Sequence, residues 1–172
     1  MDLTRFIDDV PNFPKPGILF RDITPLLADA RAFAHAVDAM AAAIAPSGVD
    51  LVAGIEARGF IFGAALAARI GRGFVPLRKP GKLPGLTVGV DYALEYGNDR
   101  LEARDGSMWH GARVLVVDDV LATGGTMAAA IELVQRAGAT PVAATVLIEL
   151  PGLNGRFRLP PGFPLARVLS FR

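Results

Sequence analysis

The residues best suited to chemistry lie in a glycine-containing turn in the second half of the chain. The turn separates an apolar run from a helical pattern and consists of Ala122, Thr123, Gly124, Gly125 and Thr126. Glycine lets the backbone approach a ligand closely, and N–H groups at the start of a helix attract an anion. Two threonine hydroxyls add hydrogen-bond donors. The pattern indicates a phosphate-binding loop, although such glycines can equally serve the turn alone.

Two adjacent carboxylates precede this turn. Asp118 and Asp119 close the apolar run that begins at Arg113, so they fall at the carboxyl end of a predicted strand. Carboxylates accept hydrogen bonds from the vicinal hydroxyls of a sugar, which gives a reason to place two like charges together. The alternative is one capping or ion-paired acid beside one solvated acid. Together with the glycine turn, the pair indicates a ribose-phosphate site.

Two common nucleotide-binding motifs are missing from the sequence. No Gly-x-x-x-x-Gly-Lys-Ser/Thr segment occurs, and Gly71 and Gly73 lack the third glycine of the dinucleotide fingerprint. The sequence therefore argues against a P-loop NTPase and against a nicotinamide-dependent dehydrogenase.

Apolar runs alternate with helical patterns around the acid pair. The runs at residues 51–55, 74–77, 113–119 and 142–150 predict strands, and the stretches at 59–70 and about 126–138 predict helices. A further helix is expected from Asp29, which can cap it, through Ile44 to an end near residues 46–48, and a short strand at residues 168–171. This alternation predicts an α/β fold with a mostly parallel central sheet flanked by helices. Ligands of such a sheet bind at the carboxyl ends of its strands.

Two segments fit neither pattern. About 28 residues at the start include prolines 11, 14, 16 and 25, which block a helix and predict an extended hood. Residues 78–85 are too rich in proline and glycine for regular structure, and alternation over residues 87–104 predicts a mobile hairpin. Long loops inside a compact domain are often lids. We therefore expect a flexible loop at about residues 80–104.

The composition limits the remaining possibilities. With 172 residues, of which 52% are hydrophobic, the chain is expected to form a single domain over residues 1–172. A net charge of +1 gives no field that would attract nucleic acid or a membrane, so we expect neither partner. The absence of cysteine excludes disulfides and thiolate zinc sites and fits a reducing cytoplasm. Acidic residues near the start argue against a signal peptide.

Four segments of the chain carry a resemblance to a known family. Residues 114–126, VLVVDDVLATGGT, resemble the phosphoribosyl-pyrophosphate signature of type I phosphoribosyltransferases. The adenine-specific branch of that family is resembled by residues 13–23 (FPKPGILFRDI), 56–63 (EARGFIFG), and 78–84 (RKPGKLP) with 94–97 (LEYG). The resemblance spans roughly residues 10–150. It implies the type I phosphoribosyltransferase fold, with an N-terminal hood and a flexible lid hairpin.

The resemblance implies a role for each matching position. The turn at residues 122–126 would hold the 5′-phosphate of phosphoribosyl pyrophosphate, and Asp118 and Asp119 would hold the ribose hydroxyls. Phe20 would stack on adenine while backbone groups of Leu19 and Arg21 read its edge, although Phe20 alone fits a core position better. The pyrophosphate would be bound by Glu56, Ala57, Arg58, Gly59, Arg78, Lys79 and Lys82. Taken alone, Arg58 could instead cap nearby carbonyls, and a short basic run is usually solvated surface.

The implied reaction is Mg²⁺-dependent transfer of the 5-phosphoribosyl group to adenine, which gives AMP and pyrophosphate in purine salvage. Substrate oxygens and water would chelate most of the magnesium, so no dedicated protein metal site is expected. Glu95 matches the family's proposed general acid/base, Tyr96 would pack in the closed lid, and Arg58 would stabilise the leaving group. The family also implies a homodimer, in which a neighbouring subunit supplies part of the positive charge.

The sequence also departs from the pattern of the family, and two alternatives stay open. Ala93 stands in the lid where a polar residue is common, and the chain past Leu150 carries little of the resemblance. One alternative is a phosphoribosyltransferase for hypoxanthine, guanine or xanthine. The other is a regulatory protein that binds phosphoribosyl pyrophosphate without catalysis, although a net charge of +1 leaves little electrostatic attraction for nucleic acid.

Overall fold

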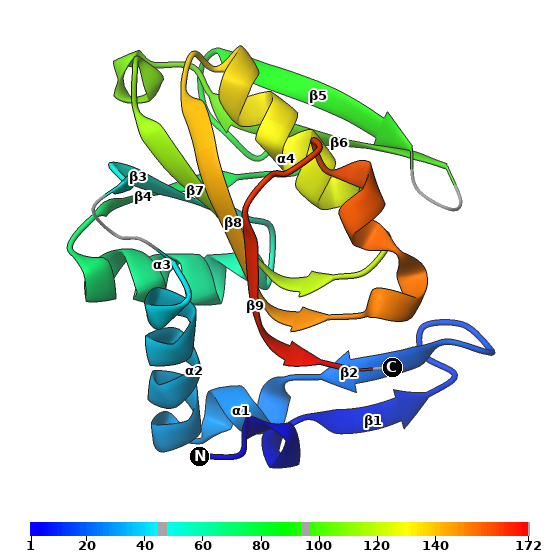
Figure 1. Ribbon diagram of the computed structural model, residues 1–172. Coiled ribbons are helices and arrows are strands. Elements are labelled where there is room, and N and C mark those ends of the chain that lie inside the picture. Colours follow the sequence, from blue (N-terminus) through cyan, green and yellow to red (C-terminus); the bar gives the residue numbers. More distant parts are fainter. Residues whose placement is uncertain (45–47, 94–96, 172) are drawn as a thin grey trace.

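A five-stranded parallel sheet forms the centre of the computed structural model, which describes residues 1–44, 48–93 and 97–171 (Figure 1). The strand order is β4-β3-β7-β8-β9, and every pair of neighbours runs parallel. The strands are β3 (Leu51–Ile55), β4 (Gly73–Leu77), β7 (Arg113–Leu121), β8 (Thr140–Glu149) and β9 (Leu165–Ser170). The predicted α/β fold is confirmed.

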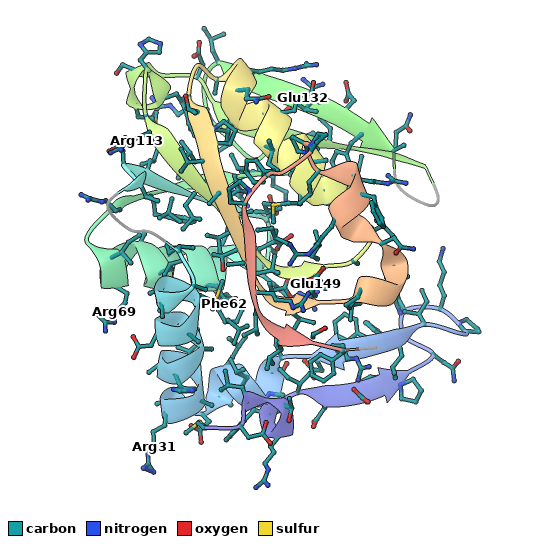
Figure 2. The ribbon with its side chains drawn as sticks, in the orientation of Figure 1. Arg31, Phe62, Arg69, Arg113, Glu132 and Glu149 are labelled. Carbon is teal, nitrogen blue, oxygen red and sulfur yellow. The ribbon has the colours of Figure 1, made fainter. Side chains whose placement is uncertain are left out.

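Helices cover both faces of the sheet because its central strands are apolar on both sides. Along β7, Leu115 and Val117 belong to the core shared with α2 and α3, whereas Val114 and Val116 belong to the core shared with α4. Figure 2 shows Phe62 of α3 within the first of these layers, where it is fully buried. The bounds of the long helices are α2 (Ala30–Ala42), α3 (Gly59–Ile70) and α4 (Gly125–Arg136).

The element boundaries follow the local sequence signals closely. The Asp29 carboxylate accepts hydrogen bonds from the N–H groups of Arg31 and Ala32, at 2.9 and 2.8 Å, and so caps α2 as predicted. Strand β7 is longer than the predicted run of residues 113–119, because its ladder with β8 continues to the pair Leu121 and Glu149. Asp118 and Asp119 therefore lie within the last part of the strand.

The N-terminal segment, predicted to be an extended hood, is a hairpin followed by a short helix. It contains η1 (Leu3–Phe6), β1 (Asp8–Pro11), β2 (Leu19–Asp22) and α1 (Thr24–Ala28). Strands β1 and β2 are antiparallel. At the hairpin bend the Phe13–Pro14 peptide is cis, and the N–H of Gly17 donates to Asn12 Oδ1 at 2.9 Å. In Figure 1 this hairpin lies next to the carboxyl end of β9.

A second hairpin lies on the α4 side of the sheet. Its strands β5 (Thr87–Ala93) and β6 (Asn98–Arg104) are antiparallel, which confirms the predicted hairpin. Between β8 and β9 the chain forms two short 3-10 turns, η4 (Pro151–Leu153) and η5 (Gly155–Arg158). Another such turn, η3 (Ser107–Trp109), precedes β7. Among the described helices, none has the length and apolar character needed to span a membrane.

Candidate active site

The predicted phosphate loop joins β7 to α4 at the carboxyl edge of the sheet. Gly124 is the N-cap of α4 and has a φ of 82°, a conformation that glycine adopts without strain. A Cβ atom at this position would lie 2.1 Å from the carbonyl oxygen of Gly155, so a side chain cannot be accommodated. The first N–H groups of a helix lack intrahelical partners. The start of α4 thus offers an anion-binding site with Thr126 at its rim.

The acid pair lies beside this loop. Asp119 is buried and Asp118 is half-buried, and Nε of Arg58 lies 2.7 Å from Oδ2 of Asp119. Burial, followed by the negative charge of Asp119, raises the pKa of Asp118 well above its ordinary value. Burial also raises the pKa of Asp119, although the Arg58 guanidinium opposes this effect. The pair therefore resists carrying two negative charges until other groups compensate them.

A loop between β3 and α3 brings Arg58 to the acid pair. The Glu56–Ala57 peptide in this loop is cis. Gly59 begins α3, and a Cβ atom there would lie 2.8 Å from the Val117 carbonyl oxygen and 2.9 Å from Oδ1 of Asp118. Only glycine permits the start of α3 to approach β7 this closely. The loop after β3 is thus packed directly against the acid pair on the neighbouring strand β7.

The carboxylate of Glu56 is engaged by the predicted basic segment. It accepts hydrogen bonds from the Lys79 backbone N–H at 2.8 Å and from Nε of Arg78 at 3.2 Å. Burial opposes the charge of Glu56, but these hydrogen bonds hold its pKa below the ordinary value. The Lys82 side chain is exposed, and its carbonyl accepts from Nη1 of Arg78 at 3.1 Å. Glu56 therefore anchors the segment that carries Lys79.

These groups surround two cavities. The first, of about 370 Å³, is polar and is lined by Glu56, Ala57, Arg58, Lys79, Asp118, Asp119, Val120, Ala122 and Thr126. The second, of about 560 Å³, is more apolar and is lined by Gly17, Ile18, Leu19, Phe20, Arg21, Arg58, Val120, Ala122, Leu150, Gly152, Leu153 and Phe171. Because Arg58, Val120 and Ala122 line both, the cavities adjoin. The arrangement can hold a charged sugar phosphate next to a flat apolar group.

Phe20 is held in the wall of the second cavity by aromatic and cationic neighbours. The ring of Phe13 meets it edge-on, with centroids 5.1 Å apart. The Arg58 guanidinium carbon lies 4.9 Å from the Phe20 centroid, within the range of a cation–π contact. Arg58 therefore connects the acid pair to the aromatic wall.

Known proteins are similar to this chain in sequence and fold. A family model of the phosphoribosyl transferase domain matches residues 26–156. The adenine phosphoribosyltransferase of Synechococcus sp. (strain CC9605) is 54% identical over 171 residues, which cover 99% of both chains. The crystal structure of adenine phosphoribosyltransferase from Thermoanaerobacter pseudethanolicus superposes with a TM-score of 0.95 at 46% identity, covering 99% of this chain and 98% of that one. This chain belongs to the adenine phosphoribosyltransferase family.

Membership of the adenine phosphoribosyltransferase family confirms the resemblance found in the sequence. Another similar solved structure is that of the Saccharomyces cerevisiae adenine phosphoribosyltransferase, complexed with adenine and an imino-altritol bisphosphate. That structure has a TM-score of 0.91 at 38% identity and covers 97% of this chain and 96% of the yeast chain. The similarity continues past Leu150, where the sequence alone showed little of it.

The structure brings most of the predicted site residues together. The turn at residues 122–126, the acid pair, the Glu56–Gly59 loop and Lys79 meet at one edge of the sheet. Leu19, Phe20 and Arg21 line the adjoining apolar cavity, whereas Arg78 and Lys82 line neither cavity. Glu95 and Tyr96 lie outside the described residues.

The sequence interpretation missed the C-terminal part of the apolar cavity. Leu150, Gly152, Leu153 and Phe171 contribute to its wall. The first three follow β8 at the carboxyl edge of the sheet, where ligands of parallel sheets bind, so their position did contain a signal. Phe171 follows β9 and offered none, because it reaches the hood only through the tertiary fold.

Proposed function

We propose that this protein transfers the 5-phosphoribosyl group of phosphoribosyl pyrophosphate to adenine, giving AMP and pyrophosphate for purine salvage. One observation carries the proposal. The polar cavity, with its phosphate loop and acid pair, adjoins at Arg58 an apolar cavity walled by an aromatic ring. This arrangement suits a sugar phosphate whose anomeric carbon faces a purine.

The proposed reaction breaks the bond from C1′ to the pyrophosphate oxygen, forms a bond from C1′ to a ring nitrogen of adenine, and releases the proton of that nitrogen. The loop at residues 122–126 would fix the 5′-phosphate, and Asp118 and Asp119 would fix the ribose hydroxyls. Arg58 and Lys79 would stabilise the leaving pyrophosphate. Positioning and electrostatics of this kind supply most of the rate in such transfers. We assign the proton to Glu95 and the cover of the site to Tyr96, as the family resemblance implies.

Magnesium is part of the proposal, and the donor set of the cavity fits it. The described residues contain no group of three or more histidines, aspartates or glutamates that could hold a metal ion. Oδ2 of Asp119 is buried and accepts no directed hydrogen bond from the described residues, although it is ion-paired with Arg58. This oxygen could accept a ribose hydroxyl or a metal-bound water. The metal would neutralise charge on the pyrophosphate while the substrate supplies most of its ligands.

The proposal extends to the setting of the enzyme. We place it in the cytoplasm because the lack of cysteine in the sequence fits a reducing compartment. We also propose a homodimer, as the family resemblance implies.

The test is to incubate the protein with phosphoribosyl pyrophosphate and Mg²⁺, adding adenine, hypoxanthine, guanine or xanthine separately, and to identify the nucleotide formed. We expect AMP and an equal amount of pyrophosphate when adenine is the added base, and no nucleotide with the other three bases. A matched double variant, Asp118→Asn with Asp119→Asn, keeps the side-chain volume but removes both charges, and its rate should fall by about 100-fold or more.

Two results would overturn the proposal. Faster nucleotide formation with a 6-oxopurine would assign the enzyme to another base. Binding of phosphoribosyl pyrophosphate without any nucleotide product would identify a regulatory protein instead.

A further inference from the structure

The hydroxyl of Tyr92 lies between Lys79 and Thr126 of the phosphate loop, and both of these residues line the polar cavity. Tyr92 on β5 pairs directly with Asp99 on β6. Its hydroxyl lies 3.0 Å from Oδ2 of Asp99, 3.0 Å from Nζ of Lys79 and 3.5 Å from Oγ1 of Thr126. The hairpin thus contacts both the phosphate loop and the lysine proposed to meet pyrophosphate.

The Lys79 ammonium already has an anionic partner. It forms an ion pair with Asp99 and lies 5.5 Å from the centroid of the Tyr92 ring. The side chains of Lys79 and Asp99 are 34% and 25% exposed, so solvent screens this pair only in part. Burial opposes the charge of Lys79, but hydrogen bonds to Asp99 and Tyr92 raise its pKa overall. Lys79 is therefore held in the charged form.

The backbone of Lys79 is fixed separately from its side chain. Its N–H donates to Glu56 and its ammonium reaches the hairpin, and Lys79 is among the residues that line the polar cavity. A change of partner at the ammonium therefore does not require the loop to leave Glu56. The pyrophosphate group carries more negative charge than one carboxylate and can compete with Asp99 for the same ammonium.

We propose that Tyr92 and Asp99 are positioning residues for Lys79, and that the pyrophosphate group of the substrate displaces Asp99 from its ammonium. Asp99 is then an internal counter-ion that competes with substrate, whereas Tyr92 keeps the ammonium beside the phosphate loop. This inference rests on the proposed function, because it takes phosphoribosyl pyrophosphate as the ligand. Neither residue is assigned a role by the segments that resemble the family.

The two residues have opposite expected effects, which separates positioning from a structural role. Asp99→Asn removes the competing charge, so the affinity for phosphoribosyl pyrophosphate should rise by about 2- to 5-fold, the range of a partly exposed ion pair. Tyr92→Phe removes the hydroxyl that holds the ammonium near Thr126, so this affinity should fall by about 5-fold. A merely structural ion pair would weaken binding, or leave it unchanged, in both variants.

The experiment measures binding of phosphoribosyl pyrophosphate with Mg²⁺ in the absence of a base, by calorimetry, and then KM for both substrates and kcat. KM for adenine should not change in either variant. The matched control is Asp91→Asn, which breaks an ion pair with Arg100 on the same hairpin, with the Asp91 side chain 72% exposed. This control should bind like the unmodified protein.

The inference is overturned if Asp99→Asn binds phosphoribosyl pyrophosphate no more tightly than Asp91→Asn, or if Tyr92→Phe binds as the unmodified protein does. A failure of the proposed function is distinguishable, because it appears in the unmodified protein as missing AMP. Binding without turnover would still test the roles of Tyr92 and Asp99.

Discussion

At the scale of single residues, the surroundings of the acid pair of β7 disfavour the ionised form of both carboxyl groups. Asp118 and Asp119 are adjacent and poorly solvated, and burial is the largest cause of the raised pKa of each. An aspartate with a raised pKa in the folded state binds its proton more readily there than in the unfolded state. The folded protein is therefore destabilised as the pH rises through that pKa. Substrate hydroxyls and a metal ion would relieve this cost.

This arrangement predicts how substrate affinity depends on pH. The affinity for phosphoribosyl pyrophosphate should fall as the pH drops through the raised pKa of Asp118, which lies well above the ordinary aspartate value of about 3.9. In Asp119→Asn the neighbouring charge that raises the pKa of Asp118 is gone, so the fall should begin at a lower pH. Binding titrations at several pH values, with saturating Mg²⁺, measure both curves.

The ligand's own phosphate groups also titrate, but they do so equally with either protein. The ratio of the two affinities at each pH therefore isolates the carboxylates. An inflection that stays in place, or moves to higher pH, in Asp119→Asn would contradict the assigned cause.

At the scale of elements, the phosphate loop depends on a segment more than thirty residues further along the chain. Gly124 packs against the backbone of Gly155 at the start of η5, and a Cβ atom at Gly155 would in turn lie 2.3 Å from the carbonyl oxygen of Ala122. The loop and the C-terminal turn therefore share one backbone contact. Any side chain at this contact must move one of the two elements.

Gly124→Ala should accordingly damage phosphate binding and stability together. The new Cβ would meet the Gly155 carbonyl oxygen at 2.1 Å, and the φ of 82° would strain alanine. We expect a loss of about 2 kcal/mol in the free energy of unfolding, and at least about a 10-fold weaker affinity for phosphoribosyl pyrophosphate. Denaturant unfolding and calorimetric titration measure the two effects.

Gly48→Ala is the control for this prediction. A Cβ at Gly48 meets no atom within 4 Å, and its φ lies outside the strained range, so both quantities should stay close to those of the unmodified protein. Equal losses in the two variants would show that the contact with Gly155 is unimportant.

At the scale of the whole molecule, the sequence predicted what is encoded by neighbouring residues and missed what depends on tertiary pairing. The helix of residues 59–70 and the parallel sheet followed from apolar periodicity, and residues 118–126 form one contiguous motif. The prolines of the hood were expected to block a helix, which was wrong at Pro25, because it lies in the first turn of α1, where proline is tolerated. They also could not reveal that β1 pairs with β2. The ion pair of Asp99 with Lys79 depends on hairpin register, and Phe171 arrives from the last strand. Neither has a local signal.

The C-terminal segment is tied to the sheet by a buried charge, which allows its contribution to the whole fold to be measured. Glu149 ends β8 and is 4% exposed, and Figure 2 shows it in the interior, close to β9. Its carboxylate accepts hydrogen bonds from Nε of Arg156 at 2.7 Å and from Nη1 of Arg167 at 2.5 Å. These bonds join η5 and β9 to the central sheet. The same turn, η5, supports the phosphate loop.

Glu149→Gln should therefore lower the free energy of unfolding by about 2 kcal/mol, because two arginines lose the charge that they were placed to meet. The matched control is Glu132→Gln on the exposed face of α4, where Glu132 pairs with Arg136 four residues on. Glu132→Gln should lower the free energy of unfolding by about 0.5 kcal/mol or less.

The hydrogen bond from Arg156 is the main cause that lowers the pKa of Glu149 in the folded protein. The charged Glu149 carboxylate therefore contributes fully to the free energy of unfolding above the pKa of glutamate in the unfolded chain, about 4.3. This contribution is lost as the pH falls through the lower pKa of the folded state. Denaturant unfolding at neutral and acidic pH should show the difference between Glu149→Gln and the unmodified protein shrinking in acid. A difference that is independent of pH would mean that packing, and not charge, holds the C-terminal segment in place.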